Sequence, residues 1–363
     1  MFGKACKANG GAVPKNVNGV WRTHLIPCFA GIAKNLIKGL NNMKLGVFTT
    51  LLSNLPFEDA LKYFTSLGIE AVEIGCGGYP GNAHANPDVL LHDEKALSDF
   101  KELIKKYNVE ISALSCHSNP VHPDRDEAAK ADKTIRDTIL LAEKLGLHQI
   151  NTFSGCPGDH EGAKYPNWVT CPWPDDFLKI LDWQWNDVLI PYWTDLVKFA
   201  KEHGVNKIAF ELHPGFCVYN TESMLRIREA VGPELGANFD PSHLIWQGME
   251  PVAVIRALGD AIFHVHAKDT RLDKYNIART GVLDTKPYSD EIHRSWLFRS
   301  VGYGNDELYW KEIVSNLRLV GYDHVLSIEH EDSLMSQNEG LSKAVEMLNR
   351  CLIKENPAAM WWA

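Results

Sequence analysis

Four residues of the types that bind metal ions end four separate apolar segments of the chain. They are Glu211, Asp240, His266 and Glu329. The first two spacings, 29 and 26 residues, each match one strand–helix unit, and the third, 63 residues, is longer by about the length of one insertion. Because the carboxyl ends of parallel strands lie at one edge of a sheet, we expect the four side chains to converge there.

Three carboxylates and one imidazole suit a divalent cation such as Mn²⁺, Mg²⁺ or Co²⁺ and leave coordination positions open for substrate oxygens. No thiolate belongs to the set, which argues against a structural zinc site. Any one of these residues could equally be a helix cap or an ion-pair partner. Four on successive strands favour a metal, because an isolated charge at the end of an apolar strand is costly. We expect one divalent ion, with Mn²⁺ as the first choice.

Other polar residues beside these strand ends are candidates for substrate binding. His213 shares a strand face with Glu211, and His243 follows Asp240 by three residues. The alternative for Glu73, which stands alone in an apolar run, is a satisfied core carboxylate. The basic residues near the second long connection could bind an anionic group, or pair with nearby aspartates. The expected substrate-binding residues are Glu73, His117, His213, His243, Lys268 and Arg299.

The elements that must position these residues follow a repeating pattern after Met43. Short segments rich in Val, Ile, Phe and Leu are predicted strands: Lys44–Thr49, Ala71–Gly75, Ile111–Cys116, Gln149–Phe153, Ile208–Leu212, Gly236–Asp240, Ala261–His266 and Val325–Glu329. Segments with apolar residues every three to four positions are predicted helices: Phe57–Leu67, Glu94–Tyr107, Glu127–Leu145, Trp185–His203, Thr221–Val231, Pro251–Leu258, Asp306–Leu319 and Gly340–Leu352. A glycine follows many of these helices, as expected of a helix C-terminus.

Eight strand-then-helix units predict a single (β/α)8 TIM barrel. An open doubly wound sheet is the alternative, but no G-x-G-x-x-G motif follows the first strand. Two connections, 155–181 and 270–305, are long and follow strands, so we expect two long loops on the catalytic face. The first contains or adjoins Trp168, Trp173, Trp183 and Trp185, which could stack on a sugar or pack the loop onto the barrel.

Composition excludes several classes of protein. The 363 residues are 45 % hydrophobic and 23 % charged, and no apolar run is long enough to span a membrane. A net charge of −9 argues against a broad nucleic-acid-binding surface. The eight cysteines form no Cys-x-x-Cys pair, so we expect reduced thiols and a cytoplasmic location.

The first 42 residues differ in charge from the rest of the chain. They contain six basic and no acidic residues, whereas the remainder carries a net charge of −15. A targeting peptide fits this segment weakly, and we expect an extension outside the fold. The predicted organisation is therefore an N-terminal extension, 1–42, a barrel domain, 43–355, and a short tail, 356–363.

The strand ends resemble the sugar phosphate isomerase/epimerase branch of the xylose isomerase-like TIM-barrel superfamily, over roughly residues 43–353. The motifs that carry this resemblance are Phe210-Glu211-Leu212-His213-Pro214-Gly215, Asn238-Phe239-Asp240-Pro241-Ser242-His243, His264-Val265-His266-Ala267-Lys268-Asp269 and Ile328-Glu329-His330-Glu331-Asp332. The resemblance implies that Glu211, Asp240, His266 and Glu329 ligate the metal and that Glu211 and Glu329 also move the proton. It further implies that His243 is a pocket histidine.

The expected activity is that of a metal-dependent sugar isomerase or epimerase. Its substrate would be a ketose, keto-sugar or sugar phosphate that loses a proton next to a carbonyl, with the cation stabilising the enediolate. A lyase or dehydratase acting on a 3-keto-glycoside or keto-inositol is the alternative, and a non-catalytic, metal-bearing, sugar-binding barrel is another. The expected partner is a small-molecule carbohydrate, with no nucleic acid and no membrane. Family habit implies a homo-oligomer.

Overall fold

The computed structural model describes residues 42–355 and residue 362. The expectations for the basic N-terminal extension and the C-terminal tail fall almost entirely outside this part of the chain. In the described residues, no helix is both long enough and apolar enough to cross a membrane.

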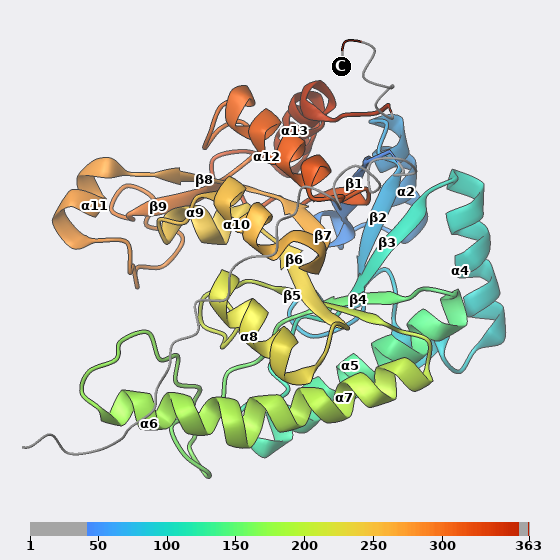
Figure 1. The fold of residues 1–363 in the computed structure, drawn as a ribbon. Helices are drawn as coiled ribbons and strands as arrows, with labels where there is room; N and C mark the ends of the chain where they lie inside the picture. Colours follow the sequence, from blue (N-terminus) through green and yellow to red (C-terminus); the bar gives the residue numbers. More distant parts are fainter. Residues whose placement is uncertain (1–41, 356–361, 363) are drawn as a thin grey trace, which may run out of the picture.

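Eight parallel strands close into a barrel, which confirms the predicted (β/α)8 fold (Figure 1). Around the barrel each strand pairs with its neighbours in the chain, and the first pairs with the last. The strands are β1 (Lys44–Phe48), β2 (Ala71–Gly75), β3 (Glu110–Ser115), β4 (Gln149–Thr152), β5 (Lys207–Glu211), β6 (Leu235–Phe239), β7 (Ile262–Ala267) and β10 (Val325–Ile328). Most of their residues are buried on both faces, which explains the continuous apolar runs in the sequence.

Amphipathic helices cover the outside of the barrel, close to where the sequence pattern predicts them. They include α2 (Phe57–Ser66), α4 (Glu94–Tyr107), α5 (Arg125–Leu145), α7 (Ile190–Glu202), α8 (Thr221–Val231), α10 (Pro251–Leu258), α12 (Glu307–Leu319) and α13 (Gln337–Cys351). Helix α5 shows how such helices begin and end: the Asp124 side chain accepts hydrogen bonds from two backbone N–H groups, and Gly146 ends the helix at φ 71°.

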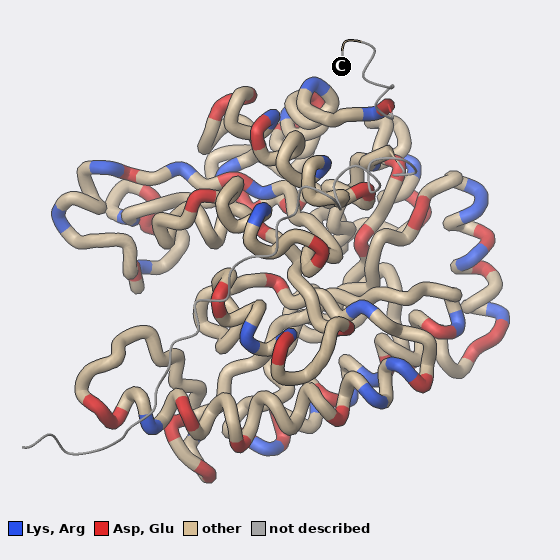
Figure 2. The backbone as a smooth tube through the Cα atoms, viewed as in Figure 1, with Lys and Arg blue, Asp and Glu red and all other residues tan. Residues whose placement is uncertain are grey.

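Shorter elements surround these helices. They are α3 (Pro87–Leu90), α6 (Asp176–Trp183), α9 (Pro241–Trp246), α11 (Lys274–Thr280), the 3₁₀ turns η2 (Thr49–Leu52) and η4 (Gly259–Ala261), and the π-helical turn η3 (Gln184–Leu189). Charged residues of both signs lie along the outer helices in Figure 2, whereas the barrel strands carry few. This distribution fits a barrel whose core is apolar and whose helices face water.

The two long connections contain more regular structure than the sequence predicts. Segment 155–181 runs into α6, which continues through η3 into α7, so this helix begins at Asp176, nine residues before its predicted start at Trp185. Segment 270–305 contains α11 and takes part in a two-stranded antiparallel sheet of β8 (Asp269–Leu272) and β9 (Trp296–Arg299). The sequence does not predict this sheet, because β8 reads Asp-Thr-Arg-Leu and contains no apolar run.

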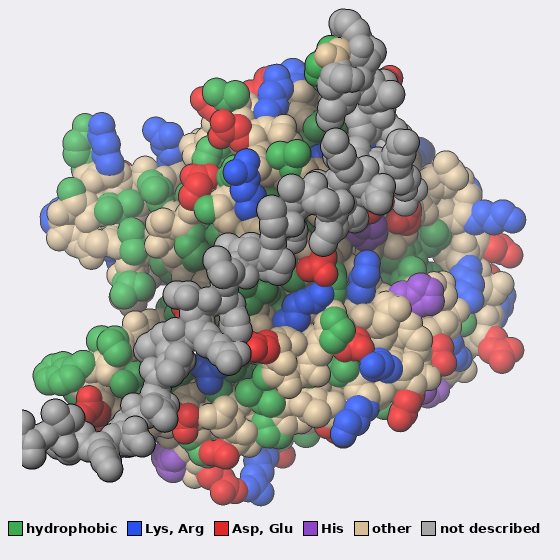
Figure 3. All heavy atoms as spheres, viewed as in Figure 1, with side chains coloured by type: hydrophobic (Ala, Val, Ile, Leu, Met, Phe, Trp, Pro, Cys, Tyr) green, Lys and Arg blue, Asp and Glu red, His purple; other side chains and the backbone are tan. Residues whose placement is uncertain are grey.

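Both insertions extend to the same side of the barrel, at the left of Figure 1. Hydrophobic side chains gather over both of them in Figure 3. Several are strongly exposed, including Trp173 on the first insertion and Tyr275 and Ile292 on the second.

Candidate active site

The four predicted metal ligands converge at the carboxyl ends of four neighbouring strands. Glu211 is the last residue of β5, Asp240 follows β6, His266 lies in β7 and Glu329 follows β10. One oxygen or nitrogen atom from each side chain lies within 4.8 Å of those from the other three. The strand order of the barrel brings these residues together, because β5, β6, β7 and β10 are consecutive neighbours.

The donor set fits a divalent cation. Asp240 and His266 are fully buried, yet Asp240 Oδ2 and His266 Nδ1 make no hydrogen bond with any residue that the structure describes. Both atoms face the other ligands: His266 Nδ1 lies 3.0 Å from Glu329 Oε2 and 3.7 Å from Glu211 Oε2. Buried polar atoms are rarely left without a partner, and three carboxylates around one imidazole need positive charge.

Asp240 owes its orientation to the start of helix α9. Its Oδ1 atom accepts a hydrogen bond of 2.8 Å from the backbone N–H of Ser242, as a helix N-cap does. Pro241 occupies the first helical position, where its missing N–H costs nothing. The cap uses one carboxylate oxygen and leaves the other facing the cluster.

Glu73 holds the opposite side of the His266 ring. Both Glu73 carboxylate oxygens lie within 3.1 Å of His266 Nε2, and they also accept hydrogen bonds from Ser115, Asn151 and Ser327. Burial alone would raise the pKa of Glu73, but the adjacent His266 and His264 lower it well below its usual value. A carboxylate that accepts from a ligating histidine fixes the ring orientation and tautomer.

Two histidines flank Glu211. The Nε2 atoms of His117 and His243 each lie 3.0 Å from one of its oxygens. Burial would raise the pKa of Glu211, but these two imidazoles and His266 outweigh it and hold the pKa well below the usual value. The His213 ring lies 4.1 Å from the ring of His243, and burial lowers the pKa of His213 to about 3. Glu211 is therefore an ionised carboxylate, and His213 is neutral near pH 7.

Lys268 supplies positive charge at the edge of the cluster. Its Nζ atom lies 2.5 Å from Glu331, 3.3 Å from Glu329 and 3.7 Å from Asp240, and only 2 % of its side chain is exposed. Burial would lower the pKa of Lys268, but these carboxylates raise it well above the usual value. The ammonium group is thus fully engaged by acidic side chains.

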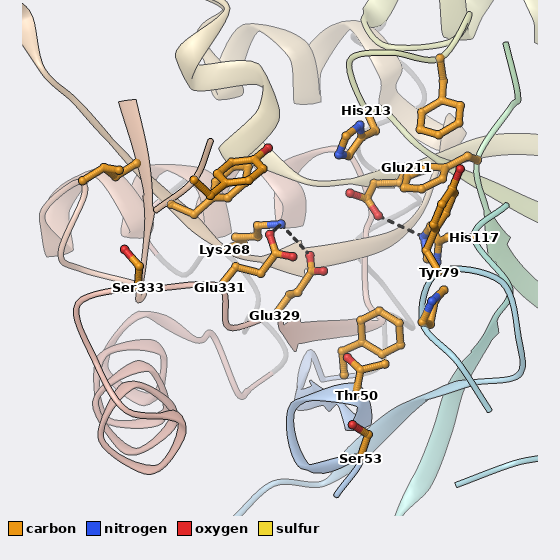
Figure 4. Close-up of a pocket in the computed structure, with 17 residues that line it drawn as sticks. Thr50, Ser53, Tyr79, His117, Glu211, His213, Lys268, Glu329, Glu331 and Ser333 are labelled. Carbon is orange, nitrogen blue, oxygen red and sulfur yellow. Dashed lines mark hydrogen bonds and ion pairs between the residues drawn. The ribbon is translucent and has the colours of Figure 1, made fainter. Parts of the chain in front are cut away.

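A cavity of about 870 Å³ opens above these residues (Figure 4). Glu211, Lys268, Glu329 and Glu331 point into its centre in the figure, and Glu211 approaches His117 on one side. Its walls mix polar and aromatic side chains. The lining residues are Phe48, Thr50, Ser53, Tyr79, Pro80, His117, Phe153, Glu211, His213, Phe216, Lys268, Tyr288, Leu297, Phe298, Glu329, Glu331 and Ser333.

Of the six predicted substrate-binding residues, three line this cavity: His117, His213 and Lys268. His243 lies directly behind Glu211 and is buried. Glu73 does not line the cavity, because it lies one layer below, as the core carboxylate that the sequence left as its alternative.

Arg299 also lies away from the cavity lining. Its Nε atom donates to Asp332 at 3.0 Å, so the guanidinium is used to tie the end of β9 to the chain after β10. The structure therefore places Arg299 in an internal ion pair, outside the residues that line the cavity. Asp269 similarly accepts hydrogen bonds from the backbone N–H groups of Gly302, Gly304 and Asn305. Among the described residues, it does not form the ion pair with a basic residue of the second connection that the sequence offered as an alternative.

None of the four tryptophans in or beside the first insertion lines the cavity. Trp185 is buried in the core, Trp168 packs against that core, and Trp173 is exposed. For Trp168 and Trp185, packing of the insertion is thus the interpretation that the structure supports.

Other aromatic residues line the cavity, and the sequence pattern does not single them out. Phe153 comes directly after β4, and its position after a strand end could have indicated it. Glu331 also lines the cavity, and its position two residues beyond Glu329 could have indicated it, because alternate residues of an extended chain share a face. Tyr288 and Phe298 come from the second insertion, and no periodicity in the sequence indicates that their side chains turn toward the barrel.

The sequence of this chain is similar to those of known proteins. The family model described as xylose isomerase-like TIM barrel matches residues 61–351. The uncharacterized protein YfiH of Bacillus subtilis strain 168 is 42 % identical over 313 residues, which cover 85 % of this chain and 99 % of that protein. An inosose dehydratase of Mesomycoplasma hyopneumoniae strain J is 26 % identical over 256 residues, covering 68 % of this chain and 76 % of the dehydratase.

Solved structures agree on the fold. A crystal structure of a D-tagatose 3-epimerase-like protein superimposes with a TM-score of 0.57 and 23 % identity, covering 85 % of this chain and 98 % of that one. At this identity the likeness concerns the arrangement of the chain and not its reaction.

Proposed function

Because the chain belongs to the xylose isomerase-like TIM barrel family, we propose that it is a divalent-metal-dependent sugar isomerase or epimerase. The observation that carries this proposal is the convergence of Glu211 and Glu329, which line an open cavity, with the buried Asp240 and His266. Glu211, Asp240, His266 and Glu329 would hold the ion. When bound, the ion would supply positive charge opposite the carbonyl and hydroxyl oxygens of a sugar.

The proton transfer is assigned to the two glutamates. Glu211 is ionised, and His117 and His243 orient it, so it can accept a proton from the carbon next to a carbonyl. Glu329 lies 3.0 Å from the same His266 Nδ1 atom that Glu211 approaches at 3.7 Å, so it is close enough to return the proton. Return to the opposite face of the same carbon gives an epimer, and return to the neighbouring carbon gives an isomer. Lys268, 3.3 Å from Glu329, would hold this carboxylate in position.

The test is solvent deuterium exchange followed by NMR in D₂O, with Mn²⁺ and a panel of ketoses and keto-glycosides. We expect deuterium at a carbon next to the carbonyl with at least one substrate. Glu211→Gln and Glu329→Gln should each reduce the rate by about 10²- to 10⁴-fold, because each removes a proton-transferring group. Metal content is measured on every variant, since both residues are also proposed ligands.

The matched control is Glu312→Gln, which changes an exposed glutamate on α12 outside the cavity. It should exchange at the wild-type rate. Metal-loaded wild-type protein that binds sugars but exchanges no deuterium with any of them would overturn the proposal in favour of a sugar-binding barrel.

A lyase or dehydratase is the second candidate, and the similarity to inosose dehydratases favours it. Elimination begins with the same proton abstraction, and then a group on the next carbon departs. In this site Lys268 or a histidine near Glu211 could assist that departure. The same NMR experiment separates the two reactions, because elimination forms a new double bond and releases water or an alcohol.

A further inference from the structure

Two aromatic walls line the cavity that also contains Glu211 and Glu329. The first wall is formed by Tyr79, Phe153 and Phe216, in which the Phe153 ring lies 4.2 Å from that of Phe216 and 5.9 Å from that of Tyr79. The second wall is formed by Tyr288 and Phe298, whose rings lie 5.8 Å apart with an interplanar angle of 25°. In Figure 4, Glu211, Glu329 and Lys268 occupy the space between the two sides of the cavity.

The second wall is built on the insertion and not on the barrel itself. Phe298 lies in β9, and Trp296 of the same strand stacks on Trp246 of α9 at 4.8 Å and 6°. The guanidinium of Arg294 lies 4.4 Å from the rings of both Tyr288 and Trp296. These contacts hold Tyr288 in place although 57 % of it is exposed. An exposed ring that is fixed from behind offers a preformed face to a ligand.

The charge of the cavity indicates what it does not bind. Lys268 is the only lysine or arginine among the described residues that line the cavity, and three carboxylates already surround it. Glu211, Glu329 and Glu331 line the same space. A phosphate would therefore meet acidic side chains and no free cation, and the divalent ion would only offset part of this negative charge.

We propose that the substrate is an uncharged sugar derivative whose reacting ring carries a second ring, and that Tyr288, supported from behind by the buried Phe298, binds the second ring. This inference rests on the proposed function for the reacting ring. A volume of about 870 Å³ lies near the top of the usual range for small-molecule sites, roughly 300–1,000 Å³, and exceeds what one sugar ring needs. The aromatic walls match the apolar faces of sugar or aryl rings.

Binding to the Mn²⁺-loaded protein tests the proposal, with affinities from isothermal titration calorimetry. The probes are D-glucose, D-glucose 6-phosphate, cellobiose and phenyl β-D-glucopyranoside. We expect cellobiose or the phenyl glucoside to bind about tenfold more tightly than glucose, the size expected of one added ring contact. Glucose 6-phosphate should bind no more tightly than glucose. Tyr288→Ala should abolish the preference for two rings.

Tyr275→Ala is the matched control, because Tyr275 is an exposed tyrosine on α11 of the same insertion that does not line the cavity. It should keep the preference. Equal binding of one-ring and two-ring probes, tighter binding of the phosphate, or an unchanged preference in Tyr288→Ala would each overturn the inference. Because these are binding measurements, a preference for two rings without any deuterium exchange would refute the proposed reaction but support the inference.

Discussion

At the scale of single residues, Asp240 both caps a helix and faces the candidate metal site. One oxygen caps α9, and the other faces the candidate metal site. The tripeptide that follows, Pro241-Ser242-His243, starts the helix and brings His243 back to 3.0 Å from Glu211. The helix cap and the candidate metal site therefore share one side chain. Different substitutions of Asp240 can remove the metal ligand alone or both the ligand and the cap.

We predict that Asp240→Asn and Asp240→Ala both lose the bound ion, from about one per chain to near none. An amide oxygen can keep the cap, but an amide presents no negative charge to a cation. Asp240→Ala should be about 0.5–2 kcal/mol less stable than Asp240→Asn, because only alanine removes the cap. The measurements are metal content by mass spectrometry and the free energy of unfolding. Full occupancy in both variants would contradict the assignment.

Glu73 gives a second prediction, because it contacts His266 but not the cavity. Glu73→Gln should lower metal affinity by about 10- to 100-fold, as expected when a residue that orients a ligating histidine is changed. Metal titration of the folded protein measures this. The matched control is Ser327→Ala, which removes one of the hydrogen bonds to Glu73 and leaves its carboxylate in place. Equal affinities in all three proteins would make Glu73 a core residue without influence on the site.

At the scale of elements, α13 lies against the residues that follow β10. Strand alternation predicts that His330 points away from Glu329 toward a helix, and the structure confirms it. A Cβ atom at Gly340 of α13 would come within 2.4 Å of two atoms of the His330 ring. The missing side chain of Gly340 thus leaves space for the His330 ring. Glycine is a poor helix former, but any larger residue at this position would collide with the ring.

We predict that Gly340→Ala lowers the free energy of unfolding, although alanine is the better helix former by about 1 kcal/mol. Overpacking of this kind costs about 1–3 kcal/mol and should outweigh the gain. In a His330→Ala background the same substitution should cost less, because only the close contact with Ser300 Oγ, at 2.7 Å, remains. Denaturant unfolding of the four proteins in a double-mutant cycle checks this. A destabilisation of the same size without the histidine ring would refute the proposed clash with His330.

The second insertion is closed by one buried carboxylate. Asp269 accepts hydrogen bonds from the backbone N–H groups of Gly302, Gly304 and Asn305 and from the Trp310 indole at 3.2 Å. These bonds bring the chain from β9 back to the start of α12. The insertion is therefore anchored to the barrel at its base. Its aromatic residues Tyr288 and Phe298 line the cavity.

At the scale of the whole molecule, an ion-pair group spans the end of the barrel opposite the site. Glu110 of β3 contacts Lys44 of β1 and lies 3.5 Å from His324, which precedes β10. The hydrogen bond from His324 and the charge of Lys44 lower the pKa of Glu110 to about 2 despite its partial burial. The group links strands on both sides of the point where the barrel closes.

The depressed pKa predicts how stability depends on pH. Glu110 contributes stability above its unfolded pKa of about 4.5, and the contribution is lost as pH falls toward 2. Glu110→Gln should therefore unfold more easily than wild type at pH 7, with the difference disappearing near pH 2. Denaturant unfolding across this range tests it, with Glu102→Gln on the exposed face of α4 as the control. A difference that does not change with pH would refute the electrostatic origin.

Much of the fold could be predicted from the sequence because its signals are local. Buried parallel strands give apolar runs, helices give a period near 3.6, and glycine marks helix ends. All eight barrel strands lie within a residue or two of their predicted bounds, and Glu211, Asp240, His266 and Glu329 converge because strand order in a closed barrel follows chain order.

Only the tertiary structure decided which other side chains share the site. Glu73 and Arg299 are chemically suited to bind a substrate, but their roles depend on partners far away in the chain, His266 and Asp332. Tyr288 and Phe298 are directed to the cavity by the packing of Trp296 on Trp246 and by Arg294. Such contacts have no periodic signature, because they depend on how separate segments meet in space. The sequence by itself therefore determined the barrel and its candidate ligands, and the tertiary structure decided the walls of the cavity.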